Sequence, residues 1–215
     1  MGGLWGTFLE VFQVGLFWLT QLYGGQLAPA IVTFSILARL ALLPATVRLT
    51  LRARAHARKI AALRPRLVAV RERWSEDPER LARETLALYR RNELSPVDAG
   101  VMGGSLLQSP VFIGMYHAVR DALRARSGEQ AFLWVSNLAR PDLGIAALAF
   151  CLVGASALAG ASESQPAWTL AVPALVSAVM ALTLSAGFGL YLAATGLVGT
   201  LQGLVVRRIE AGGTA

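Results

Sequence analysis

The sequence predicts an all-α membrane protein: a five-span helical bundle with an N-terminal interfacial amphipathic helix and a cytoplasmic antiparallel helical hairpin. Three observations support this class. Of the 215 residues, 55% are hydrophobic. The apolar residues gather in runs of about 20, which is the length of a helix that crosses a hydrocarbon core of roughly 30 Å. The basic residues are concentrated, since 13 of the 20 Lys and Arg residues lie between Arg48 and Asp98.

The first element expected is an amphipathic helix over residues 4–23, within an N-terminal segment of residues 1–27. Large apolar residues recur in it at steps of three and four: Trp5, Phe8, Phe12, Leu16 and Leu19. A helix lying in the membrane interface has this pattern. A sixth spanning helix is the alternative, although it would carry Glu10 into the bilayer at a cost in free energy.

Five spans are expected within a core of residues 28–215. They cover residues 28–47, 99–119, 143–161, 168–185 and 187–206. Residues 48–98 are too charged to lie in lipid, and the positive-inside rule places such a basic loop in the cytoplasm. The N-terminus is then outside and the C-terminus is cytoplasmic. Counting residues 4–23 as a sixth span would move the N-terminus inside without moving this loop.

Residues 48–98 are expected to form two helices that pair as an antiparallel hairpin. The second helix has a clear start signal, with Asp77 as N-cap, Pro78 at the first helical position and Glu79 in the first turn. The basic residues of the first helix are candidates for contacts with anionic lipid or with the phosphates of a ribosome or another RNA. These residues are Arg52, Arg54, Arg58, Lys59, Arg64 and Arg66.

Arg39, within the first span, is the principal candidate functional residue. A charged side chain at bilayer depth costs about 2.5–3.5 kcal/mol on insertion scales, and the five expected spans contain no Asp or Glu that could pair with it. Their neutral polar residues are the remaining neighbours, so we expect a hydrated cavity around the guanidinium. The proposed groove residues are Arg39, Thr33, Ser35, Gln108, Tyr191, Thr195 and Gln202, with Ser105 and Ser109 as further polar neighbours.

The residue types do not predict an enzyme. His56 and His117 lie on different elements, Cys151 is the single cysteine, and no phosphate-binding glycine loop or metal-ligand spacing occurs. We therefore expect no catalytic residue, no cofactor and no metal site. Two other functions are compatible with the charges: a membrane-tethered protein that binds the ribosome or RNA, and a small anion channel or transporter that uses Arg39 for selectivity.

Four stretches resemble segments of one known family, in the same order and at compatible spacing. They are TFSILARLALLPATVRLTLRARAHARKIAALRPRL (33–67), LYRRNELSPVDAGVMGGSLLQSPVFIGMYHAVRD (88–121), FLWVSNLARPD (132–142) and GFGLYLAATGLVGTLQGLVVRRIE (187–210). The family is that of the YidC/Oxa/Alb membrane protein insertases. At three positions in or just before the last span, this sequence departs from the pattern of many relatives: Ser185, Leu192 and Gly196.

The resemblance implies a protein transport function in a bacterial inner or plasma membrane. It implies a hydrophilic groove, with Arg39 as its charge, that receives the polar part of a nascent membrane protein. The apolar segments of that substrate then pass into lipid, without nucleotide hydrolysis, and the protein acts as an insertase and chaperone. The partners implied are nascent membrane proteins, a ribosome, a secretion channel, and anionic lipids at the basic hairpin.

Overall fold

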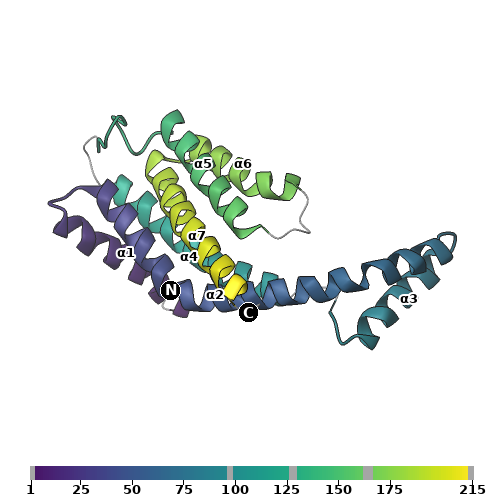
Figure 1. Ribbon diagram of the computed structural model, residues 1–215. Coiled ribbons are helices and arrows are strands. Elements are labelled where there is room, and N and C mark those ends of the chain that lie inside the picture. The colour runs from purple at the N-terminus through teal and green to yellow at the C-terminus, as the bar shows by residue number, and fades with distance from the viewer. Residues whose placement is uncertain (1–2, 96–98, 126–129, 162–166, 213–215) are drawn as a thin grey trace. The chain divides into compact units, whose positions relative to one another are not determined.

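The computed structural model describes residues 3–95, 99–125, 130–161 and 167–212, with the side chains of residues 4, 99–107 and 167 left aside. Ser105 therefore falls outside the described side chains. The helices are α1 (Leu4–Leu22), α2 (Leu27–Arg73), α3 (Pro78–Arg91), α4 (Ala99–Arg124), α5 (Leu143–Gly160), α6 (Ala167–Thr183) and α7 (Ala186–Gly212), as Figure 1 shows. Among the described residues no strand forms, so the all-α prediction is confirmed.

Within the part of the chain that the structure describes, three helices are long and apolar enough to cross a membrane. They are α2, α5 and α7, and the apolar part of α6, Trp168–Thr183, is shorter. α2 is longer than the first expected span, because it continues to Arg73 and includes the first basic segment as well. The count of five spans remains a prediction.

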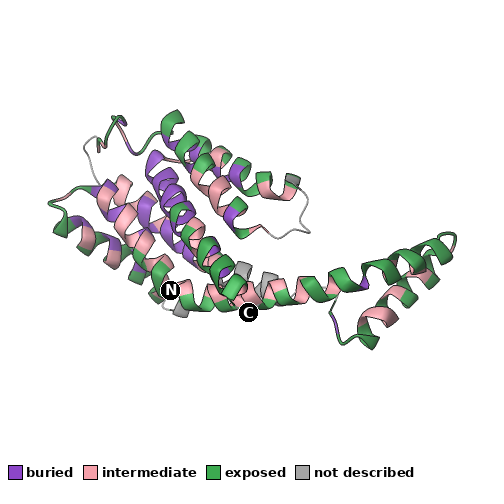
Figure 2. Ribbon diagram, viewed as in Figure 1, coloured by how far each residue is buried: buried purple, intermediate pink, exposed green. Residues whose placement is uncertain are grey.

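The chain divides into two compact units. One, which we call the core unit, contains Met1–Pro44 and Gln108–Ala215, and the other, the charged unit, contains Ala45–Leu107. In the core unit the most deeply buried helix is α7, in which every residue from Ala186 to Gly196 is buried, as the purple ribbon of Figure 2 shows. Helix α7 therefore forms the centre of this unit.

Helices α5 and α7 run in the same direction at very close range. Three glycines of α7, seven residues apart, face three residues of α5 with the same spacing: Gly189 against Ile145, Gly196 against Leu152 and Gly203 against Ala159. Each pair is 44 residues apart in the sequence, so the register is constant along the interface. A seven-residue period is that of a left-handed helix pair, and small residues allow the two backbones to approach each other.

Helix α1 packs on the core unit through aromatic contacts. The ring of Phe12 meets the ring of Phe34 on α2 edge-on, with centroids 5.5 Å apart. Gly114 of α4 leaves room for the Phe12 ring, since a Cβ there would lie 3.0 Å from it. The Gln13 side-chain amide also donates a hydrogen bond to Asp121 of α4, at 2.9 Å. Helix α1 is thus held on one side, while Val11, Trp18 and other apolar side chains of the helix are exposed.

In the charged unit, the predicted start of α3 is confirmed. The Asp77 carboxylate accepts a hydrogen bond from the backbone N–H of Arg80 at 3.0 Å, and Pro78 and Glu79 occupy the first turn. The guanidinium of Arg80 lies over the Trp74 ring, 4.8 Å from its centroid. This cap and stack fix the turn that follows α2.

Candidate functional site

Arg39 lies on α2, partly buried, on the side of the helix that faces the rest of the core unit. Its Nε atom is buried and makes no hydrogen bond to any residue that the structure describes. Buried donors without a partner are rare in proteins, and each one calls for water, an ion or a ligand. Within the described part of the chain, the Arg39 Nε therefore has no protein partner. This agrees with the sequence, in which the five expected spans contain no Asp or Glu.

Tyr191 of α7 is the polar neighbour of Arg39, close enough for an electrostatic interaction between the guanidinium and the phenol. The Tyr191 side chain is only 2% exposed. Its ring packs against Phe188, at 5.2 Å between centroids, and against Phe112 of α4, at 6.2 Å. This aromatic cluster holds the phenol in place and excludes bulk water from its ring face.

Arg39 and Tyr191 come within electrostatic range of each other because α2 and α7 run side by side in the same direction. Nearer their starts, the Ile31 side chain lies 3.4 Å from the position of a Cβ on Gly187. Arg39 follows Ile31 by eight residues, and Thr195 follows Gly187 by the same number. Long helical side chains lean toward the N-terminus of their helix, which brings the guanidinium back toward Tyr191.

The hydroxyls of three other predicted groove residues already have hydrogen-bond partners. Ser35 donates to the carbonyl of Ile31 at 2.5 Å, and Thr195 donates to that of Leu192 at 2.8 Å, so each bonds to its own helix. Thr33 shares a hydrogen bond of 2.8 Å with the Tyr23 hydroxyl near the end of α1. Gln108 and Gln202 are half-buried. The structure thus brings Tyr191 to Arg39, while the Thr33 hydroxyl turns to Tyr23.

The predicted partner residues of the charged unit lie mostly on its surface. Arg52, Arg58, Lys59, Arg64 and Arg66 are exposed and Arg54 is half-buried. Arg64 also lines a pocket of about 360 Å³ between α2 and α3, with Leu67, Val68, Arg71, Leu81 and Thr85. The sequence predicts that these two helices pair, and the structure adds that Arg71 joins Arg64 at the pocket between them.

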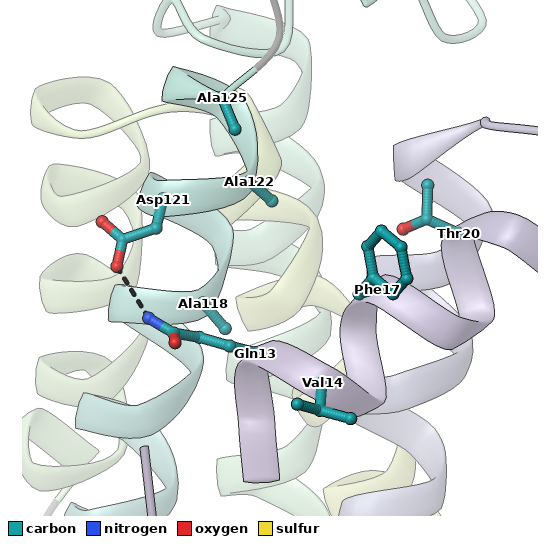
Figure 3. A pocket seen from close by; sticks show the side chains of 8 residues that line it. All are labelled: Gln13, Val14, Phe17, Thr20, Ala118, Asp121, Ala122 and Ala125. Atoms are coloured by element: carbon teal, nitrogen blue, oxygen red, sulfur yellow. Dashed lines mark hydrogen bonds between the residues drawn. The ribbon is translucent and has the colours of Figure 1, made fainter. Parts of the chain in front are cut away.

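A second pocket, of about 530 Å³, lies between α1 and α4 in the core unit (Figure 3). It is lined by Gln13, Val14, Phe17, Thr20, Ala118, Asp121, Ala122 and Ala125. Its polar groups are already bonded: Gln13 donates to Asp121, and the Thr20 hydroxyl donates to the Leu16 carbonyl at 2.7 Å. Sequence reasoning missed this pocket, because the alanines of α4 carry no signal of their own.

Comparison with known proteins agrees with this architecture. The family model described as "60Kd inner membrane protein" matches residues 18–212. "Membrane protein insertase YidC 1" of Lactiplantibacillus plantarum is 29% identical over 201 residues, covering 88% of this chain and 64% of that protein. "Membrane protein insertase YidC" of Ralstonia nicotianae is 32% identical over 140 residues, covering 62% of this chain and 24% of that protein. The chain therefore spans less than two thirds of the length of either relative.

A solved structure shares the fold. It is described as "Active YidC insertase crystal structure with the first transmembrane domain resolved", and it matches with a TM-score of 0.61 at 20% sequence identity. The match covers 93% of this chain and 46% of that one. Since the family model matches most of the chain, this protein belongs to the 60Kd inner membrane protein family, which is the YidC/Oxa/Alb family of membrane insertases.

Proposed function

We propose that this protein is a membrane protein insertase and chaperone that uses Arg39 to receive polar parts of nascent membrane proteins. The single observation that carries the proposal is the buried Nε of Arg39, which has no partner among the described residues. A guanidinium always carries its charge and presents five donors. Because this donor is left unpaired inside an apolar unit, it is available to water and to the carboxylates or peptide carbonyls of a passing segment.

The energetics of insertion need no nucleotide in this scheme. Each Leu-like residue gains about 0.3–0.6 kcal/mol on entering the membrane, so a substrate helix of 20 apolar residues supplies its own driving force. The barrier is the passage of the polar flank of that helix. A hydrated, positively charged groove formed by Arg39, Thr33, Ser35, Gln108, Tyr191, Thr195 and Gln202 lowers this barrier, and the apolar segment then leaves into lipid.

The remaining parts of the proposal concern topology and partners. Residues 28–47, 99–119, 143–161, 168–185 and 187–206 cross the membrane, residues 4–23 lie in its outer interface, and residues 48–98 form a cytoplasmic hairpin. The N-terminus is outside and the C-terminus is cytoplasmic. The exposed Arg52, Arg58, Lys59, Arg64 and Arg66 support contacts of this hairpin with anionic lipid, a ribosome or a secretion channel.

Site-specific crosslinking tests the proposal directly. A photoreactive residue is placed at Ile36, one helical turn before Arg39, and stalled ribosomes present nascent membrane proteins with short polar tails. We expect crosslinks to the nascent chain from this position, and none from Val172 on the exposed side of α6 as a matched control. No crosslink from Ile36 with any of several substrates would refute the groove.

Ion flux separates insertion from the alternative of an anion pathway. Purified protein in liposomes should leave a chloride gradient intact while it inserts a small membrane protein supplied by a translation system. Sustained chloride flux that disappears in Arg39→Leu, together with absence of insertion, would instead favour the channel.

A further inference from the structure

A short turn before α5 is held firmly against the start of that helix. Phe132 and Val135 exchange two backbone hydrogen bonds, of 2.8 and 2.9 Å. Leu133, at the tip, has a φ of 54°, a left-handed conformation that non-glycine residues rarely adopt. The Trp134 indole N–H donates to the Asp142 carboxylate at 3.1 Å, and the same oxygen caps α5 by accepting from the Ile145 N–H at 2.9 Å.

This constrained turn displays apolar side chains instead of burying them. Leu133 is 73% exposed, Trp134 is 59% exposed, and Leu143, the first residue of α5, is 74% exposed. We call these three residues the α5 cap. The cap continues directly into α5, whose Leu148 and Phe150 are also exposed and which is long and apolar enough to cross a membrane.

We propose that the α5 cap docks in the membrane interface, where lipid headgroups meet acyl chains, and so sets the depth of the core unit in the bilayer. Tryptophan concentrates in this layer because its ring is apolar and its N–H is polar. In the cap the N–H is already bonded to Asp142, which leaves the ring face and the two leucines for lipid. The proposal rests on one part of the proposed function, namely that α5 crosses the membrane, and it does not rest on insertion activity.

A second tryptophan marks the opposite end of the same helices. Helices α5 and α6 run antiparallel, since Gly154 faces Ala174 while Ile145 and Ala181 both lie against Gly189 of α7, and they lie side by side in Figure 1. Trp168, at the start of α6, is 68% exposed. With 18 and 17 residues, the two helices are about 27 and 25 Å long at 1.5 Å per residue. Trp134 and Trp168 therefore bracket a layer close to the roughly 30 Å of a hydrocarbon core.

The docked cap also assigns a depth to Arg39. In the constant register of α5 and α7, Tyr191 is level with Ala147, four residues or about 6 Å beyond Leu143. Thr195 is level with Cys151, about 12 Å beyond Leu143. Because the Arg39 guanidinium lies within electrostatic range of Tyr191, it sits roughly 6–12 Å below the interface, in the half of the bilayer nearer the cap.

Single-tryptophan fluorescence tests the docking. A variant that keeps Trp134 alone is reconstituted in phosphatidylcholine vesicles whose acyl chains carry bromine at shallow or deep carbons. The substitutions are Trp5→Phe, Trp18→Phe, Trp74→Phe and Trp168→Phe. We expect shallow bromine to quench Trp134 more strongly than deep bromine, and aqueous iodide to quench it weakly. The matched control keeps Trp74 alone, in the charged unit, and iodide should quench it while bromine does not.

The opposite pattern for Trp134 would overturn the proposal. Strong iodide quenching without bromine quenching would show that the cap stands in water, where a protein partner could cover it instead. Insertion activity plays no part in this measurement, so a failure of the cap and a failure of the insertase function remain distinguishable.

The native Cys151 provides a depth measurement on the otherwise unaltered chain. It is the single cysteine and it is exposed, so one nitroxide label reports its depth through collisions with oxygen and with a water-soluble nickel chelate. We expect collisions with oxygen to outnumber collisions with the nickel chelate, because the residue lies about 12 Å below the interface. The double variant Leu133→Ser with Trp134→Ser should change the oxygen-to-nickel ratio at least twofold, whereas Val172→Ser on α6 should not. An unchanged ratio in the double variant would refute depth-setting by the cap.

Discussion

Gly196 of α7 lies against the backbone of Leu152 of α5, so closely that a Cβ on the glycine would stand 2.7 Å from the Leu152 carbonyl carbon. Gly203 has the same relation to Ala159, one seven-residue repeat further along. The obstructing atoms include backbone atoms at both positions, so a rotamer change alone cannot make room. The two helices would have to move apart, and the buried start of α7 would lose contacts with its neighbours.

We therefore expect Gly196→Ala to lower the thermal stability of the protein. Overpacking of this kind costs about 1–3 kcal/mol. The control is Gly160→Ala, because Gly160 is also helical and no atom lies within 4 Å of the place that its Cβ would take. Unfolding temperatures in the same detergent, followed by circular dichroism, compare the two variants. Equal temperatures would show that α5 and α7 do not depend on this contact.

The Arg39→Leu variant should gain stability and lose function. Removing an incompletely paired buried charge relieves a desolvation cost of a few kcal/mol, so the unfolding temperature should rise or stay the same. Insertion of a small membrane protein with a charged tail should fall, because the groove loses its charge, and Arg39→Lys should retain part of the activity. A loss of both stability and insertion in Arg39→Leu would mean that Arg39 is structural.

The sequence was sufficient to place most helices, because their ends carry local chemical signals. Apolar runs located α5 and α6 to within two residues at each end, and the first helix, expected over residues 4–23, is Leu4–Leu22. Asp77 was recognisable as a cap because an acidic residue before proline has few other roles at a helix start. Such signals depend only on neighbours in sequence.

The arrangement of polar groups around Arg39 could not be read in the same way. Serine and threonine can bond to their own helix, and Ser35 and Thr195 do so, whereas Thr33 finds Tyr23 on another segment. The residues around a serine or threonine in the sequence do not show whether its hydroxyl bonds to its own helix or to another segment. Gly196 is the clearest case: it departs from the pattern of many relatives, yet the α5 backbone leaves no room for a Cβ at this position.

Loss of the Asp142 carboxylate should release both α5 and the cap. Asp142→Ala removes the helix cap, at about 1 kcal/mol, and also the acceptor of the Trp134 indole. In the protein that keeps Trp134 as its single tryptophan, we expect a shift of its emission maximum. Asp77→Ala is the control, because it removes an equivalent cap from α3 and should leave Trp134 emission unchanged. Identical spectra for the two variants would mean that Trp134 does not depend on Asp142.

The hydrogen bond between Gln13 and Asp121 should hold α1 on α4. Asp121 also accepts from the Arg120 guanidinium at 3.2 Å, and both of these side chains are about one third exposed. Solvent weakens such bonds, so we expect Gln13→Ala to cost about 1 kcal/mol, or roughly a fivefold faster hydrogen exchange in α1. Gln21→Ala, on the same helix with its side chain exposed, is the control. Equal exchange in the two variants would leave the aromatic contacts of Phe12 as the attachment of α1.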